Sequence, residues 1–113
     1  MAQYMDNLVN HAFTIASGQT VSAAIDLQGR TVVAMYMPSA FTGSTITFQT
    51  SPDNSTFQAL YNTSNTQMSA TVTQARNYKF DPGDLSGIRY LKLVSGSAEG
   101  ADRTIIISTM ELR

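Results

Sequence analysis

The 113-residue chain contains no cysteine, no tryptophan and a single histidine, His11. The lack of cysteine excludes disulfides, thiolate zinc sites and cysteine nucleophiles. One histidine cannot supply a multi-histidine metal site, and a lone histidine in an N-terminal segment is most often solvated. We therefore expect no catalytic residue, no cofactor and no metal site built on these side chains.

Charge is also scarce. Charged residues make up 13% of the chain and the net charge is -1, against about 25% charged residues in typical soluble domains. Twelve serines and 14 threonines supply much of the remaining polarity. The seven basic residues are scattered from Arg30 to Arg113 without a cluster, so we expect no nucleic-acid partner. A weakly charged surface rich in hydroxyls favours a protein that packs against neighbours.

Targeting, membrane and phosphate-binding signals are missing as well. The N-terminus MAQYMDNLVN lacks the basic start and apolar run of a signal peptide. No segment approaches the ~18 apolar residues that span a bilayer. Gly83, Gly87, Gly96 and Gly100 are spaced irregularly and do not form a phosphate-binding loop. We expect synthesis in the cytoplasm, no membrane association and no nucleotide cofactor.

The clearest positive signal is a β-hairpin between residues 45 and 61. Apolar and polar residues alternate on both sides of the turn SPDNS at residues 51–55. Pro52 fixes its φ angle, and the neighbouring aspartate and asparagine bond their own backbone readily. The alternation predicts that Ile46, Phe48 and Phe57 point inward.

Strand-like runs recur along the rest of the chain at short intervals. They are separated by glycine, proline, serine and asparagine clusters that favour turns. The eight runs lie at about residues 13–16, 21–27, 31–37, 45–50, 57–62, 69–73, 87–94 and 104–110. This spacing predicts an all-β, antiparallel sandwich, a jelly roll of about eight strands, formed by a single domain at residues 13–113.

The last run contains three consecutive isoleucines at residues 105–107. Such a run indicates a strand that is buried on both faces. The second face could be covered by a neighbouring chain or loop, or by the protein's own N-terminal segment.

Residues 1–12 differ from the rest and are expected to form a short N-terminal arm. Met1, Tyr4, Met5, Leu8 and Val9 recur at a spacing near 3.6 residues, which fits a short amphipathic helix or an extended arm with apolar anchors. The arm could dock on a partner or on the protein's own sandwich. In the first case Tyr4, Met5, Leu8 and Val9 are the candidate partner-binding residues.

Two acidic loops are candidate cation sites. Asp81 and Asp84 bracket a Pro-Gly pair and could hold a hard cation, although such a sequence is more often a simple turn. Glu99 and Asp102 have the same ambiguity, with a loop role favoured. No metal site is therefore expected.

Two resemblances extend this interpretation. TSPDNSTF at residues 50–57 follows a strand, and FDP at residues 80–82 precedes GIRYLKL at residues 87–93. This order resembles the galactose-binding-like, or discoidin-like, jelly rolls. Taken whole, with ADRTI at residues 101–105 before a last apolar strand, the chain is similar to small virion proteins of tailed bacteriophages.

The phage resemblance implies a non-enzymatic virion protein, most simply a capsid decoration (cement) protein that bridges shell subunits. Its partners would be the major capsid protein or other virion subunits, and it would form a homo-oligomer, with a trimer favoured. The discoidin-like pattern implies the alternative, a carbohydrate-binding module on a virion or cell surface. A concave patch with exposed aromatic residues beside polar groups would favour the alternative, and exposed apolar patches would favour the structural role.

Overall fold

The structure is a computed structural model that describes residues 6–111. This part of the chain contains strands and no helix, as the sequence predicted. The nine strands are β1 (Asp6–Ile15), β2 (Ile25–Asp26), β3 (Thr31–Tyr36), β4 (Thr45–Ser51), β5 (Gln58–Ala59), β6 (Ser69–Thr71), β7 (Asn77–Lys79), β8 (Tyr90–Ser95) and β9 (Arg103–Glu111).

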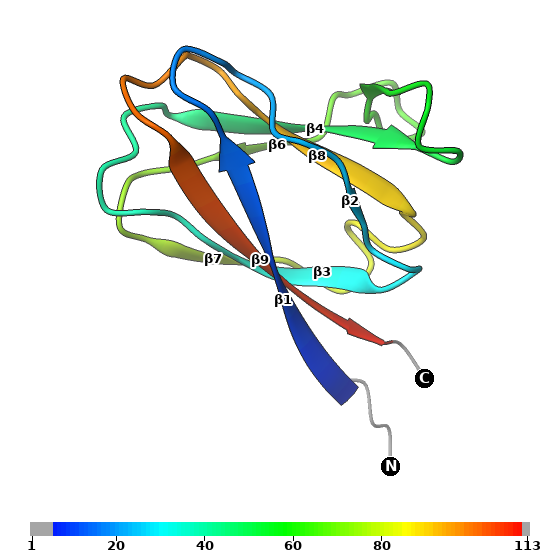
Figure 1. Ribbon diagram of the computed structural model, residues 1–113. Helices are drawn as coiled ribbons and strands as arrows, with labels where there is room; N and C mark the ends of the chain where they lie inside the picture. Colours follow the sequence, from blue (N-terminus) through cyan, green and yellow to red (C-terminus); the bar gives the residue numbers. More distant parts are fainter. Residues whose placement is uncertain (1–5, 112–113) are drawn as a thin grey trace.

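The strands form two antiparallel sheets that pack face to face (Figure 1). The first sheet has the order β1-β9-β3-β7, and the second has the order β2-β8-β4-β5, with β6 also paired to β4. Because β5 and β6 both lie along β4, they act as two halves of one strand position. The chain otherwise crosses to the opposite sheet at each step, which is the strand order of a jelly roll. The predicted all-β antiparallel sandwich is confirmed.

One strand was missed, and two were much shorter than expected, including the run at residues 21–27, where only the two-residue β2 forms. β7 is the sequence Asn-Tyr-Lys, where the single aromatic Tyr78 gives no alternation to detect. The run expected at residues 57–62 contains only the two-residue β5 and an isolated bridge between Tyr61 and Gln67.

The N-terminal region departs most from the expectation. β1 runs without interruption through residues 6–12 and on to Ile15, and it pairs with β9 along this length apart from an irregularity between Asp6 and Val9. The expected boundary between an arm at residues 1–12 and a domain at residues 13–113 is therefore not seen. Residues 6–12 are extended rather than helical, while Tyr4 and Met5 lie outside the described residues.

The core lies between the sheets and is built from alternate residues of the long strands. In β8, Leu91 and Leu93 are fully buried, whereas Tyr90 and Lys92 are half-buried on the other face. Phe48 packs edge-on against Phe80, with ring centroids 6.1 Å apart and an interplanar angle of 84°. The largest fully buried side chains are Phe13, Ile15, Leu27, Met35, Phe41, Ile46, Phe48, Leu85, Leu91, Leu93, Ile105 and Ile107.

The predicted hairpin is correct for its first strand and wrong for Phe57. Ile46 and Phe48 are buried as expected. Phe57 instead covers Lys92, whose Nζ lies 4.3 Å from the ring centroid. Since Lys92 alternates with the inward-facing leucines of β8, Phe57 lies on the outer face of the second sheet. A wide turn displaces Phe57 from the simple alternation.

That turn is organised by Asp53. Its Oδ1 accepts hydrogen bonds from the hydroxyl of Ser51 and from the backbone N–H groups of Ser55 and Thr56, at 2.8, 3.0 and 3.2 Å. These bonds, led by the one from Ser51, lower the pKa of Asp53. Asn54 adopts a left-handed φ of 59°, which asparagine tolerates better than most residues.

The two phenylalanines give a matched test of this assignment. Phe48→Ala should lower the free energy of unfolding by about 3 to 5 kcal/mol, because it removes a buried ring and leaves a cavity. Phe57→Ala removes the same atoms from the outer face and should cost about 1 kcal/mol. Denaturant titration of both variants measures the difference, and equal losses would contradict the inward and outward assignment.

Candidate interaction surface

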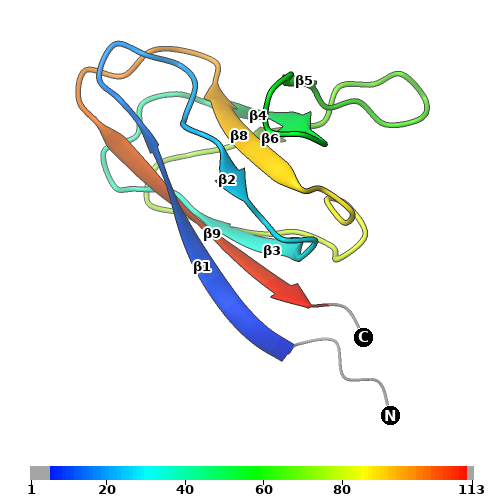
Figure 2. The ribbon, with the colours of Figure 1, turned by 45° about the vertical axis from the view of Figure 1, so that its right-hand side comes forward.

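The first sheet is covered by the second sheet on one face only. In the described part of the chain no further layer of strands lies over its outer face (Figure 2). The register places Ala12 of β1, Ile106 of β9 and Tyr36 of β3 side by side in one row. The next row contains Asn10, Ser108 and Ala34.

A groove lies on this face. It has a volume of about 260 Å³ and is lined by residues of all four strands and of the segment after β7, most of them apolar. We call it the outer groove, and its lining residues are Leu8, Val33, Ala34, Tyr36, Lys79, Phe80, Pro82 and Ser108.

Two large side chains in the outer groove are open to solvent. Leu8 is 56% exposed and Tyr36 is 37% exposed, and Val9, next to Leu8 on β1, is 38% exposed. Of the candidate partner-binding residues, Leu8 lines the groove and Val9 does not; their binding role remains a prediction. No local pattern singles out Tyr36 or Phe80, because they reach the groove only through the pairing of β3 with β9 and β7.

The isoleucine run explains part of this face. Ile105 and Ile107 are fully buried in the core, and Ile106 is half-buried on the outer face between Ala12 and Tyr36. Its cover thus comes in part from β1, which is the protein's own N-terminal segment. The expectation of a strand buried on both faces is met only partly, since the outer side of Ile106 stays accessible.

Side-chain hydrogen bonds fix β1 to β9 on both faces. On the outer face the hydroxyl of Ser108 donates to Oδ1 of Asn10, and the hydroxyls of Thr14 and Thr104 lie 2.9 Å apart. On the inner face Nε2 of His11 lies 3.3 Å from Oγ1 of Thr109. His11 is half-buried rather than solvated, and burial, followed by the charge of Arg30, lowers its pKa.

The main residue that sequence reasoning undervalued is Glu99. Its side chain is only 3% exposed and lies in the loop between β8 and β9. The carboxylate accepts hydrogen bonds from the backbone and hydroxyl of Thr42, from the backbone of Gly43 and from Nε of Arg103, at 2.9 to 3.0 Å. Glu99 thereby ties two loops together at one end of the sandwich. Thr42 and Gly43 are remote from Glu99 in sequence, so no local motif indicates the role.

Gly43 suits this arrangement. A Cβ atom at this position would lie 3.0 Å from the ring of Phe41 and 3.1 Å from the hydroxyl of Ser95. Any larger residue would therefore require these two side chains to shift by a few tenths of an ångström. The pKa of Glu99 is raised by burial, the largest influence, but the hydrogen bonds outweigh it and leave the pKa lowered.

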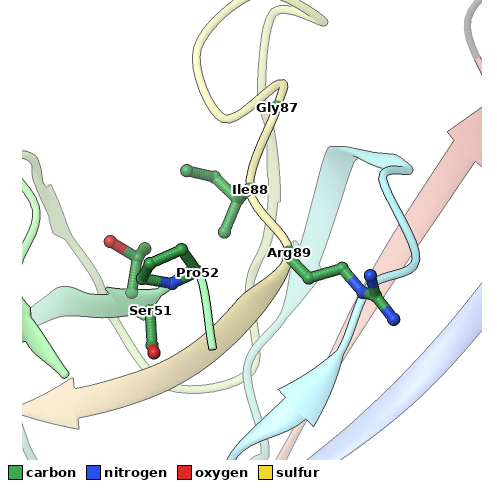
Figure 3. Close-up of a pocket in the computed structure, with 6 residues that line it drawn as sticks. Ser51, Pro52, Gly87, Ile88 and Arg89 are labelled. Carbon is green, nitrogen blue, oxygen red and sulfur yellow. The ribbon is translucent and has the colours of Figure 1, made fainter. Parts of the chain in front are cut away.

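Two hollows flank the hairpin turn on the second sheet. The first, of about 390 Å³, is lined by Thr50, Ser51, Pro52, Gly87, Ile88 and Arg89. In Figure 3 the side chain of Ile88 points toward Pro52, whereas that of Arg89 extends away from the hollow. Arg89 instead forms two hydrogen bonds with Asp26, at 2.6 and 3.0 Å, and the pKa of Asp26 is lowered mainly by them.

The second hollow, of about 490 Å³, contains an exposed aromatic residue. Tyr61 is 49% exposed and lies with Thr50, Asp53 and Gln58 among the lining residues. This combination of one aromatic ring and polar groups is the feature that the carbohydrate alternative requires.

The acidic turn at residues 81–84 has the geometry of a simple turn. The N–H of Asp84 donates to the carbonyl of Asp81 at 2.9 Å, and both side chains are exposed. Within residues 6–111 no three His, Asp or Glu side chains come together as a metal site would need.

Comparison with known proteins shows that a solved structure has a similar fold. The sequence matches no protein-family model and no curated protein. Among solved structures, the chain is similar to the crystal structure of the SPBc2 prophage-derived protein YomS, with a TM-score of 0.56 and 16% sequence identity. The match covers 96% of this chain and 99% of that chain, so the two share the whole fold. The described residues include no helix with the length and hydropathy needed to cross a bilayer.

The lowered pKa of Glu99 predicts how the free energy of unfolding depends on pH. Because its folded pKa is lowered, it stabilises the fold fully above its ordinary pKa of about 4.3, and this stabilisation is lost as the pH falls through the folded value. Glu99→Gln should therefore be about 2 to 4 kcal/mol less stable than the native chain near pH 7. The difference should shrink below about pH 4.

Urea denaturation between pH 3 and pH 7 measures both effects. Asp84→Asn removes an exposed carboxylate in a turn and is the control that should follow the native chain. A Glu99→Gln deficit that stays constant across this range would contradict the assigned role.

Proposed function

We propose that this protein is a non-enzymatic structural component of a phage particle that binds another virion subunit through the outer groove. The exposed apolar groove, with Leu8 and Tyr36 at its surface, is the observation that carries the proposal. The fold shared with a prophage-derived protein supports a phage origin. Within the particle we assign it a decoration, or cement, role on the head.

The size of the outer groove supports a protein partner. Pockets for small-molecule ligands usually have volumes of about 300 to 1,000 Å³, and the groove, at about 260 Å³, is smaller. It suits one apolar anchor from a neighbouring subunit. Fully covering a side chain such as that of Leu8 contributes about 1.5 to 3 kcal/mol.

Cement action follows from binding to one state of the shell. A protein that binds only the assembled shell stabilises that shell by mass action, without being needed to form it. The major capsid protein is the expected partner, and the particle is the expected location. Two carboxylates that could otherwise act in catalysis form ion pairs, which supports the non-enzymatic role. The buried carboxylate of Glu99 pairs with Arg103, and the more exposed carboxylate of Asp26 pairs with Arg89.

The carbohydrate alternative is kept because of the hollow at Tyr61. Aromatic rings stack on sugar faces, and the neighbouring hydroxyl, amide and carboxylate groups could bond sugar hydroxyls. This hollow lies on the second sheet, so the two functions can be tested separately.

Two tyrosines of similar exposure provide the test. Particles produced without this chain should assemble but rupture at a lower temperature, and adding the purified native protein should restore their stability. Tyr36→Asp places a charge in the outer groove and should fail to restore it, whereas Tyr61→Asp should succeed. Mass spectrometry of the particles would verify which variants are bound.

Two results would contradict the proposal. Particle stability that is independent of this chain would remove the cement role. A glycan-array signal that is lost in Tyr61→Asp and kept in Tyr36→Asp would favour the carbohydrate-binding module.

A further inference from the structure

The two sheets of the sandwich have four edges, and they are not protected equally. Three are formed by very short strands: β7 has three residues, β2 has two, and β5 and β6 have two and three. Short edge strands are a common way to prevent unwanted strand pairing. β1, the fourth edge, has ten residues.

β1 also lacks the other usual protections. Its sequence DNLVNHAFTI contains no lysine and no proline, and its single charged residue apart from His11 is Asp6, at the first position. β9 pairs with one side of β1, and no described strand pairs with the other side. In an antiparallel ladder alternate residues direct their N–H and C=O groups away from the partner strand. β1 therefore presents a row of free backbone groups.

We propose that β1 pairs antiparallel with β1 of a second copy of this chain, joining the two first sheets into one continuous sheet of twice four strands. A two-fold axis makes such an interface self-complementary, so no different partner surface is needed. The proposal rests on this edge alone and does not depend on the virion role.

Side-chain parity restricts the register of this pairing. Asn10 and Ala12 lie on the outer face, and residues directly opposite each other must share a face. If the two-fold axis passes between the two copies of Asn10, Ala12 of each copy lies opposite Leu8 of the other copy. The dimer then contains two identical apolar pairs. Because the strands are antiparallel, the two Asp6 residues lie at opposite ends of the ladder. The net charge of -1 per copy gives little long-range repulsion.

The expected interface is small. Ten residues at about 3.3 Å each give a strand of roughly 33 Å, and a sheet edge about 10 Å thick then buries on the order of 330 Å² per copy. Stable dimers usually bury about 800 Å² per partner. The pairing should therefore be weak in solution and should appear as the protein concentration rises.

Sedimentation velocity over a wide concentration range tests the proposal on the full-length chain. The native protein should pass from monomer to dimer. Ala12→Lys adds a lysine to the exposed edge and should weaken dimerisation at least about tenfold. Ala59→Lys makes the same change at an exposed position of β5 in the second sheet and should dimerise like the native protein.

Two further measurements locate the contact. Hydrogen exchange should show alternate amides of β1 becoming slower to exchange as concentration rises. Because the chain has no cysteine, a spin label can be placed at one introduced cysteine. Labels on Ala12→Cys should lie close together across the dimer, and labels on Ala59→Cys should lie farther apart. These readings decide the question even if Ala12→Lys does not fold.

Several outcomes would overturn the inference. One is a protein that stays monomeric throughout, and another is a trimer or dimer that Ala12→Lys leaves unchanged. A third is protection of the β1 amides only when phage particles are added, which would assign the edge to a strand of another virion subunit. None of these depends on Tyr36, so failure here is distinguishable from failure of the outer-groove proposal.

Discussion

The antiparallel ladder between β1 and β9 holds the first sheet together. β9 lies between β1 and β3, so the sheet would divide without it. The register runs from Asp6 opposite Glu111 to Ile15 opposite Arg103, and the contacting residues His11 and Thr109 are 98 positions apart in sequence. Closing so long a loop costs conformational entropy before any contact forms. The ladder therefore depends on a core that already brings the chain ends together, and the outer groove depends on the ladder.

The two faces of β9 show how one strand serves both core and surface. Its inward residues Ile105 and Ile107 are fully buried, whereas Ile106 points outward and is only partly covered by its neighbours on β1 and β3. Ser108, also on the outer face, is buried and donates a hydrogen bond to Asn10. The outer face is thus partly apolar, and side-chain hydrogen bonds link β1 to β9 across it.

Local alternation was sufficient to predict the sandwich and the inward positions of Ile46 and Phe48. It failed where the position of a residue depends on a remote partner. Phe57 was predicted to lie in the core because the alternation of apolar and polar residues does not reveal the extra length of the turn organised by Asp53. The extension of β1 from residue 13 back to Asp6 was not predicted, because nothing near it in sequence shows that β9 continues to Glu111. Glu99 resembled an ordinary loop residue in the sequence, because several of its hydrogen-bond donors belong to the distant segment around Thr42 and Gly43.

The weakness of a one-strand interface bears on where it could operate. In dilute solution an interface of this size competes poorly with the loss of translational and rotational freedom. Copies held beside one another on a shell have already lost much of that freedom, and their effective concentration is high. The outer groove and the β1 edge share Leu8 and adjoin one another, so anchoring through the groove would set the orientation of the free edge. A long unprotected edge, which would be a hazard in a freely concentrated protein, is then compatible with a molecule that meets its own copies mainly on an ordered surface.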